Sequence, residues 1–370
     1  MLRLLHILLL LMPLTGYAQT TSERNPISCQ INYLGGKILV HTPKIHLTPP
    51  RYSQAFELSY SRQTTGEKEW HQRFGFPEIA LNLSAARYGS AELGMAFGFY
   101  PSIAFPILRF KHADWYWKLG GGIGMATQSW QRTPASDSMN NILGSKVNNF
   151  TMIQTAYRFS FQKHWTIQAG IHFFHVSNAA ARQPNYGINT LGVFLGAAYH
   201  RSGYSNTFIK KSLPHHPNPL NLGFRTSISF SEAKTVDGPI YPHYNFTLFG
   251  AKMYRNKSRA ILGADATYSS KVYAFLKNGY TYPGKERKYA WQYSVFAGHE
   301  FVFGKIGLPL QLGYYLNHSI GGNKLYQKLG LNYHFYHRSH KVLKDLFLFT
   351  QLKTHYASAE YAEIGLGCLF

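Results

Sequence analysis

Apolar and polar residues alternate along most of this chain with a period of two. The alternation is clearest between residues 165 and 177, where one row is apolar and the other is polar or glycine. The apolar row there is Trp165, Ile167, Ala169, Ile171 and Phe173. A period of two is typical of a β-strand whose two faces meet different surroundings. The pattern recurs in about sixteen segments and continues to the last residue, which predicts an all-β protein.

The N-terminus predicts export. Arg3 precedes an apolar run from Leu4 to Leu14, and small residues follow it up to Ala18. This arrangement is typical of a secretory signal peptide spanning residues 1–18. A membrane anchor is the alternative, but about eleven apolar residues are too few for a bilayer that needs roughly 20.

The rest of the chain, residues 19–370, is rich in Gly, Tyr and Phe and has no second long apolar segment. This composition, combined with alternation, favours a transmembrane antiparallel β-barrel of about 12–16 strands in the bacterial outer membrane. A secreted β-sandwich or propeller is the soluble alternative. The end of the chain favours the barrel, because the aromatic Phe370 closes an alternating strand. Such an ending resembles the signal by which barrel-assembly machinery recognises outer-membrane proteins.

One proline-rich stretch, residues 201–218, interrupts the alternation. It could be a linker between two domains. Strand-like alternation resumes directly at Leu220, however, with an apolar row that continues in the same style as before it. We therefore expect one barrel that continues across this break.

The formal net charge of +22 permits several interpretations. A basic chain can bind nucleic acid or an anionic membrane. The basic residues are scattered rather than clustered, and an exported chain rarely meets nucleic acid. Anionic lipopolysaccharide is therefore the expected partner, and part of the excess charge would line the barrel lumen.

The two cysteines, Cys29 and Cys368, lie near opposite ends of the exported chain. In a single closed barrel the first and last strands are neighbours, so a disulfide across the seam is one interpretation. Two unpaired cysteines in the barrel wall are the favoured interpretation, because sequence does not reveal their separation.

Polar residues that could take part in catalysis lie at the end of the alternating segment 165–177. His175 and Ser177 continue its apolar row, and Asn189 opens the apolar row of the next segment, Leu191, Val193, Leu195, Ala197 and Tyr199. Two neighbouring strands would thus bring a His, a Ser and an Asn together on the lipid-facing side. As the segment is the seventh from the N-terminus, this end would face outward from the cell. Polar groups in this place indicate a lipid substrate.

The same residues carry a resemblance to a known family. The chain reads His-Val-Ser-Asn-Ala-Ala from His175 and Gln-Pro-Asn-Tyr-Gly-Ile-Asn from Gln183. This resembles the active-site region of the PagL family of outer-membrane lipid A 3-O-deacylases, or acyloxyacyl hydrolases. The family pattern is His-x-Ser-Asn-Ala-Gly, Gln-Pro-Asn-x-Gly-Ile and then an acidic residue. The family barrel is small, with about eight strands. Residues 30–201 would match it in outline, and residues 219–370 would add further barrel strands.

The resemblance implies roles for individual residues. Ser177 would be the nucleophile that attacks the ester carbonyl of an acyl chain on lipid A, and His175 its general base. A strand places residues two apart on one side, within reach of a hydrogen bond. The oxyanion hole and its loop would lie at Asn178, Ala180, Asn185 and Gly187. No cofactor or metal is implied.

Two departures from the family pattern bear on activity. Asn189 stands at the position of the family's acidic residue, and Ala180 stands where the pattern has Gly. An Asn orients a His but does not stabilise the imidazolium by charge. Three interpretations follow: a neutral group suffices, another carboxylate such as Glu360 or Glu363 replaces it, or catalysis is lost. Ala at position 180 matters only if the backbone there has a positive φ.

Two functions from other classes compete with an esterase. A catalytically silent barrel would act as a channel or structural protein and would need an open lumen. A surface receptor would bind lipopolysaccharide through basic loops without turnover. A metal site is not favoured, since residues such as His172 and His175 point to opposite faces of one strand.

Overall fold

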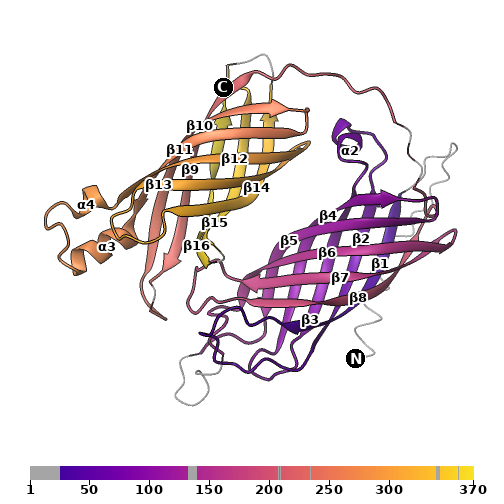
Figure 1. Cartoon of the computed structure of the whole chain (residues 1–370), viewed down its shortest axis with the longest axis horizontal. Helices are drawn as coiled ribbons and strands as arrows, with labels where there is room; N and C mark the ends of the chain where they lie inside the picture. The colour runs from indigo at the N-terminus through magenta and orange to yellow at the C-terminus, as the bar shows by residue number, and fades with distance from the viewer. Residues whose placement is uncertain are drawn as a thin grey trace.

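The computed structural model describes residues 26–131, 140–206, 208, 210–233, 235–338, 342–356 and 358–370. The predicted signal peptide, residues 1–18, lies outside the described residues. Figure 1 shows that the described chain forms two separate β-barrels. The first contains β1 (Ile27–Ile38), β2 (Ser53–Gln63), β3 (Glu78–Arg87), β4 (Met95–Arg109), β5 (Ala113–Ala126), β6 (Val147–Gln162), β7 (Trp165–Ser177) and β8 (Ile188–His200).

The second barrel follows the segment of residues 201–219. It contains β9 (Leu220–Glu232), β10 (Ile240–Tyr254), β11 (Ser258–Ser269), β12 (Trp291–Phe303), β13 (Ile306–Asn317), β14 (Leu325–His337), β15 (Asp345–His355) and β16 (Ser358–Leu369). Three short helices lie between strands: α2 (Glu69–Arg73), α3 (Ser270–Asn278) and α4 (Glu286–Tyr289). None of the helices in the described ranges has the length and apolar character needed to cross a membrane.

The all-β antiparallel class and the expected number of strands are confirmed, but the expectation of one barrel is wrong. β8 pairs with β1, from Ser28 opposite His200 to Ile38 opposite Thr190, so the first sheet closes on itself after eight strands. β16 pairs with β9 in the same way. The stretch 201–218 is therefore the connection between two barrels, which the resumed alternation had argued against.

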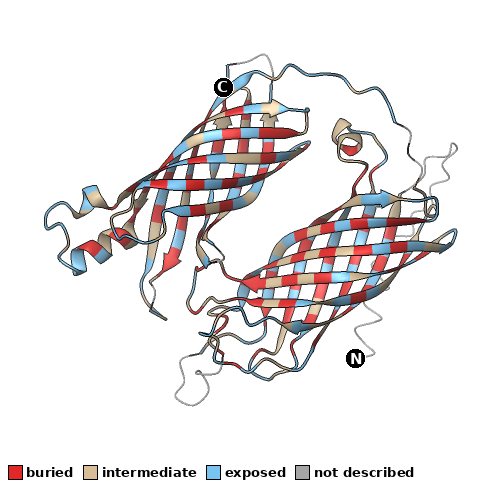
Figure 2. Ribbon diagram, viewed as in Figure 1, coloured by how far each residue is buried: buried red, intermediate tan, exposed pale blue. Residues whose placement is uncertain are grey.

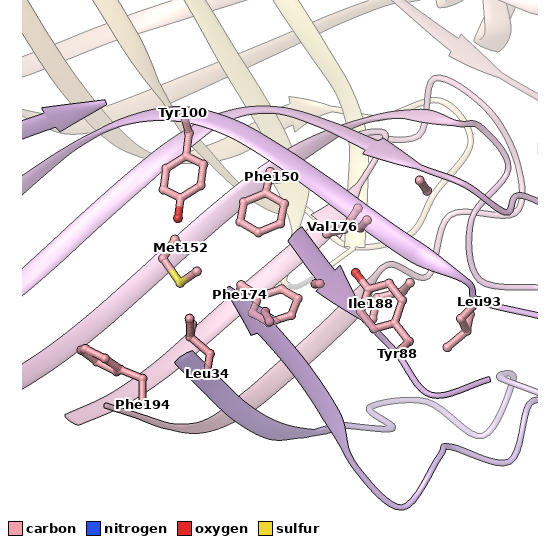
Figure 3. Close-up of a cluster of buried hydrophobic side chains, with 14 of the residues drawn as sticks. Leu34, Tyr88, Leu93, Tyr100, Phe150, Met152, Phe174, Val176, Ile188 and Phe194 are labelled. Atoms are coloured by element: carbon pink, nitrogen blue, oxygen red, sulfur yellow. The ribbon is translucent and has the colours of Figure 1, made fainter. Parts of the chain in front are cut away.

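The filling of the two lumens explains why each sheet closes at eight strands. An eight-stranded barrel has an interior that side chains can fill, whereas about sixteen strands enclose an aqueous channel. In the first barrel the rings of Tyr100, Phe150 and Phe174 stack in series inside the wall (Figure 3). A Cβ on Gly98 would lie 2.7 Å from the Phe150 ring, so glycine makes room for this aromatic row.

Buried charges complete each lumen, and they are paired. In the first barrel the fully buried Glu57 accepts a hydrogen bond from Lys118 Nζ at 2.8 Å and another from Asn32. In the second barrel Lys328 Nζ lies 3.1 Å from Asp265 and 3.0 Å from Glu363. Because a buried charge is costly without a partner, each network belongs to one barrel and fixes its own interior.

The outward rows are apolar, as expected of strands that face lipid. Figure 2 shows buried and exposed residues alternating along the strands of both barrels. In β7 and β8 the exposed row includes Ile167, Ile171, Val193 and Leu195. Such an apolar exterior around a polar and aromatic interior is typical of a membrane barrel.

The two barrels contact each other at both ends. At the end where β1 begins, Phe74, the residue after α2, packs on Phe303 of β12 with ring centroids 4.2 Å apart. Lys257 Nζ lies 3.5 Å from the Arg73 carbonyl oxygen. At the opposite end the β7–β8 loop contacts Glu232, the last residue of β9. The barrels therefore lie side by side with β1 and β9 running in the same direction.

The cysteines lie in different barrels. Cys29 is on β1, Cys368 is on β16, and both are free. The favoured interpretation of two unpaired cysteines is confirmed. The premise of a shared seam was wrong, because each of these strands closes its own barrel.

Candidate active site

The candidate site lies where β7 ends and β8 begins. The register of this pair places His175 opposite Asn189, and the register of β6 with β7 places Ser177 opposite Asn149. His175, Ser177 and Asn189 all lie on the outward row. On the inner side of the same strands, Phe174, Val176 and Ile188 pack into the barrel core (Figure 3). The rigid wall thus fixes the backbone that carries the three polar residues.

The three side chains form one hydrogen-bonded row. His175 Nδ1 lies 2.6 Å from Asn189 Oδ1, and His175 Nε2 lies 2.7 Å from Ser177 Oγ. An amide oxygen only accepts, so Nδ1 carries the proton and Nε2 is the acceptor for the Ser177 hydroxyl. This is the tautomer in which a histidine removes a proton from a serine. The structure thus brings together the three residues that the sequence singled out.

A fourth residue, His41, extends this row and was missed from the sequence. It lies just after β1, which pairs with β8, and its Nδ1 accepts a hydrogen bond of 3.0 Å from Asn189 Nδ2. This bond fixes which end of the amide faces His175. His41 is 148 residues away in the chain, within an irregular segment without periodicity. The sequence could have indicated His41 only through its position just after β1, combined with knowledge that β1 pairs with β8.

Gly187 is required by the imidazole of His175. Its φ is +76°, and a Cβ at this position would lie 2.6 Å from His175 Cε1 and 3.2 Å from the Ser177 Cβ. Any side chain at position 187 would displace the ring or the loop. The glycine therefore lets the returning chain pass directly over the base.

The loop between β7 and β8, residues 178–187, is held by its own polar groups. The backbone N–H of Asn178 donates to Asn185 Oδ1 at 2.9 Å, and Asn178 Nδ2 donates to Ser145 Oγ at 3.0 Å. Asn185 thus ties the end of the loop back to its first residue. The Asn178 backbone amide is occupied, so it is not a donor for an oxyanion in this structure.

Ala180 has the conformation that favours glycine. Its φ is +63°, within the left-handed region, and Ala179 before it has φ +55°. The position where the family pattern has Gly therefore does need positive φ. Among the described residues, none accepts a hydrogen bond from the Ala180 backbone N–H.

Neither Glu360 nor Glu363 replaces the acidic residue, and this interpretation was wrong. Glu363 points into the lumen of the second barrel, where it accepts from Ser227 Oγ at 2.7 Å. Glu360 pairs with His355 and Lys353 in the same barrel. Asn189 lies in the first barrel, and its hydrogen-bond partners among the described residues are the two histidines His175 and His41.

No group of three or more His, Cys, Asp or Glu within the described ranges is arranged to hold a metal ion. His172, as expected from strand geometry, faces inward from the same strand that presents His175 outward, and its Nε2 lies 3.3 Å from the Gly35 carbonyl oxygen.

Two family models match the chain, one on each barrel. The model described as lipid A 3-O-deacylase (PagL) matches residues 54–198. The model described as acyloxyacyl hydrolase, C-terminal domain, matches residues 219–370. The chain belongs to the PagL family. The second barrel is therefore the C-terminal domain of this family rather than a set of strands added to one barrel.

Among solved structures, the chain is similar to the outer membrane enzyme PagL, with 17% identity, coverage of 45% of this chain and 97% of that chain, and a TM-score of 0.32. It is also similar to Neisserial surface protein A, with 8% identity, 48% and 99% coverage, and a TM-score of 0.33. Among curated proteins none matches the chain.

Membership of the PagL family and the apolar outward rows agree on the location of the chain. It is a protein of the bacterial outer membrane. The β7–β8 site consequently faces the lipid or its headgroup region, not an aqueous lumen.

Proposed function

We propose that this protein removes an ester-linked acyl chain from lipid A of lipopolysaccharide, using Ser177 and His175. The observation that carries the proposal is the hydrogen-bonded row Asn189–His175–Ser177 on the outward surface of a PagL-family barrel. A nucleophile beside its base, with the base held by a third group, is the arrangement that acyl transfer needs.

The proposed reaction proceeds in two steps. Ser177 Oγ attacks the ester carbonyl while His175 Nε2 takes its proton, and the same proton passes to the departing sugar hydroxyl as the C–O bond breaks. Water then hydrolyses the acyl-serine by the reverse proton path, which releases a fatty acid. Asn189 orients the imidazole without adding charge. The backbone N–H of Asn178 already donates to Asn185, and one Nδ2 hydrogen of Asn178 donates to Ser145. We therefore assign the backbone N–H of Ala180 and the other Nδ2 hydrogen of Asn178 as the oxyanion donors.

The position of the site supports a lipid substrate. Below His175 and Asn189 the outward rows carry exposed Ile171, Leu191 and Val193, along which an acyl chain would lie. The ester would then sit at headgroup depth beside Ser177. The excess positive charge of the chain suits the phosphates of lipopolysaccharide. In this orientation the β7–β8 loop, and the end of the second barrel that lies beside it, face the cell exterior.

The proposed route to the membrane uses the last strand. The outward row of β16 includes exposed Ile364 and Leu366, and exposed Phe370 follows the strand directly. The Phe370 backbone N–H donates to the Leu222 carbonyl oxygen at 2.7 Å. We infer recognition of this terminal strand by barrel-assembly machinery.

The channel alternative is not supported. Paired charges and stacked aromatic rings fill the lumen in the described parts of both barrels. A cavity among Gln30, Glu78 and Lys118 in the first lumen has a volume of about 10 Å³, which is far too small for a conducting path.

Mass spectrometry of lipid A tests the function. We expect lipid A from a host that expresses the wild-type chain to lose the mass of one acyl group, and lipid A from a host that expresses Ser177→Ala to keep it. The host must carry the ester-linked acyl pattern of the native lipid A. Unchanged lipid A with a correctly inserted wild-type protein would refute the proposal.

A further inference from the structure

Glu232 is an acidic residue at the end of an apolar, outward-facing row of the second barrel. It is the last residue of β9 and continues the outward row of Leu220, Leu222, Ile228 and Phe230. A charged side chain on a lipid-facing row destabilises a barrel unless it is near the interface or paired. Yet Glu232 is only 1% exposed. Something outside the second barrel therefore covers it.

The cover is the β7–β8 loop of the first barrel. The backbone N–H of Gln183 donates to Glu232 Oε2, and Arg182 lies 3.3 Å from Oε1. The Glu232 backbone N–H donates to the Ala180 carbonyl oxygen at 3.4 Å. Lys271 Nζ, on α3, donates to the Glu232 carbonyl oxygen at 2.7 Å. One residue of the second barrel thus binds three successive parts of the loop.

The loop is held from two sides as a result. On its other side it contacts the β5–β6 connection, where the Tyr186 N–H donates to the Ile142 carbonyl oxygen at 3.0 Å and Gly144 leaves no room for a Cβ beside Gln183. Ala180, whose carbonyl oxygen accepts the Glu232 backbone hydrogen bond, lies three residues after Ser177 with its backbone in the left-handed region. Such a conformation persists only where the surroundings determine it.

We propose that Glu232 is a positioning residue for the hydrolysis. Through Glu232 the second barrel holds the β7–β8 loop of the first barrel, which carries the proposed oxyanion donor Ala180, in its reactive geometry. This inference rests on the proposed deacylation. It gives the C-terminal barrel a task in catalysis: to complete the loop around Ser177. Arg182, whose side chain is 49% exposed, contributes less than the Gln183 backbone N–H, because a half-exposed ion pair is screened by solvent.

The test uses the full chain in detergent and two measurements on each variant. Hydrogen exchange of peptides covering residues 178–187 reports the loop, and kcat and KM with lipid A report the reaction. In Glu232→Ala we expect exchange at the Gln183 amide to rise at least about tenfold. We expect kcat to fall about tenfold or more with little change in KM, since the loop would stabilise the transition state rather than bind the chain.

Two matched variants separate positioning from general destabilisation. Glu232→Gln keeps an oxygen that accepts from Gln183 and should recover most of the loop protection and kcat. Lys257→Met weakens the contact between the barrels at their other end, near Arg73 and Phe74, and should leave both measurements close to wild type. An equal loss of kcat in Lys257→Met would assign the effect to barrel contact in general.

The two proposals fail in distinguishable ways. An inactive wild-type chain would refute the deacylase and, with it, the catalytic task of Glu232. An active wild type beside a Glu232→Ala variant with unchanged loop exchange and unchanged kcat would overturn the positioning role alone.

Discussion

At the scale of single residues, Asn189 sets the strength of the proposed base. Its amide orients His175 but adds no negative charge, and replacing the acid of a catalytic triad by its amide costs about 10⁴ in rate in one serine protease. Asn189→Asp keeps the shape of the side chain and an oxygen toward His175, and replaces the Nδ2 group that faces His41 by a second oxygen. We expect kcat for lipid A to rise at least about tenfold, since the carboxylate would stabilise the imidazolium.

Steady-state kinetics on purified protein would measure this change. Asn189→Ala is the matched control and should lose activity, because Nδ1 of His175 would have no partner. His41 Nδ1 accepts from Asn189 Nδ2 in the wild type. In Asn189→Asp, His41 would change tautomer so that Nδ1 carries the proton and donates to the carboxylate. A lower kcat in Asn189→Asp would show that the His41–Asn189 bond matters more than charge.

The sequence predicted some of these residues and missed others for a physical reason. His175, Ser177 and Asn189 were predicted because a period of two places them on one face of neighbouring strands and because the motif around them resembles the PagL family. His41 and Glu232 reach the site through pairings of strands far apart in the chain, and alternation carries no information on such pairings. Glu232 did leave a signal: it is a carboxylate at the end of an apolar row.

At the scale of elements, the β7–β8 loop carries backbone strain at Ala180. A left-handed backbone costs an L-residue other than Gly roughly 1 kcal/mol or more. We therefore expect Ala180→Gly to raise the free energy of unfolding by up to about 1 kcal/mol, partly offset by the greater entropy of glycine in the unfolded chain. Denaturant unfolding in detergent measures it.

Ala181→Gly is the control for this variant. Ala181 is exposed, and its φ is not among the positive values of the loop. Glycine there gains no relief and should lower stability by about 0.5–1 kcal/mol. If both variants destabilised equally, the left-handed conformation of Ala180 would not be the property that the family's glycine provides.

At the scale of the whole molecule, the sequence predicted the strands but not how they close into barrels. Period two identifies the two faces of each strand, and nearly all the expected segments became strands. Closure depends instead on which edge strands pair, here β1 with β8 and β9 with β16. The inward rows held a clue, since residues as large as Tyr100, Phe150, Tyr326 and Tyr361 suit narrow, filled lumens rather than one wide pore.

Two closed barrels with separate charge networks should lose stability separately. Lys118→Met leaves the carboxylate of Glu57 buried without its cation, which typically costs about 3–5 kcal/mol. The described partners of Glu57 all belong to the first barrel, so we expect the first barrel to unfold at lower denaturant while the second is unaffected. Five of the six tryptophans precede residue 201, so fluorescence follows the first barrel, and Trp291 alone reports the second.

Adding Glu57→Gln to Lys118→Met should restore part of the loss, because the unpaired charge is removed. A single transition shifted as a whole in Lys118→Met would mean that the contacts at α2 and Glu232 couple the barrels into one folding unit.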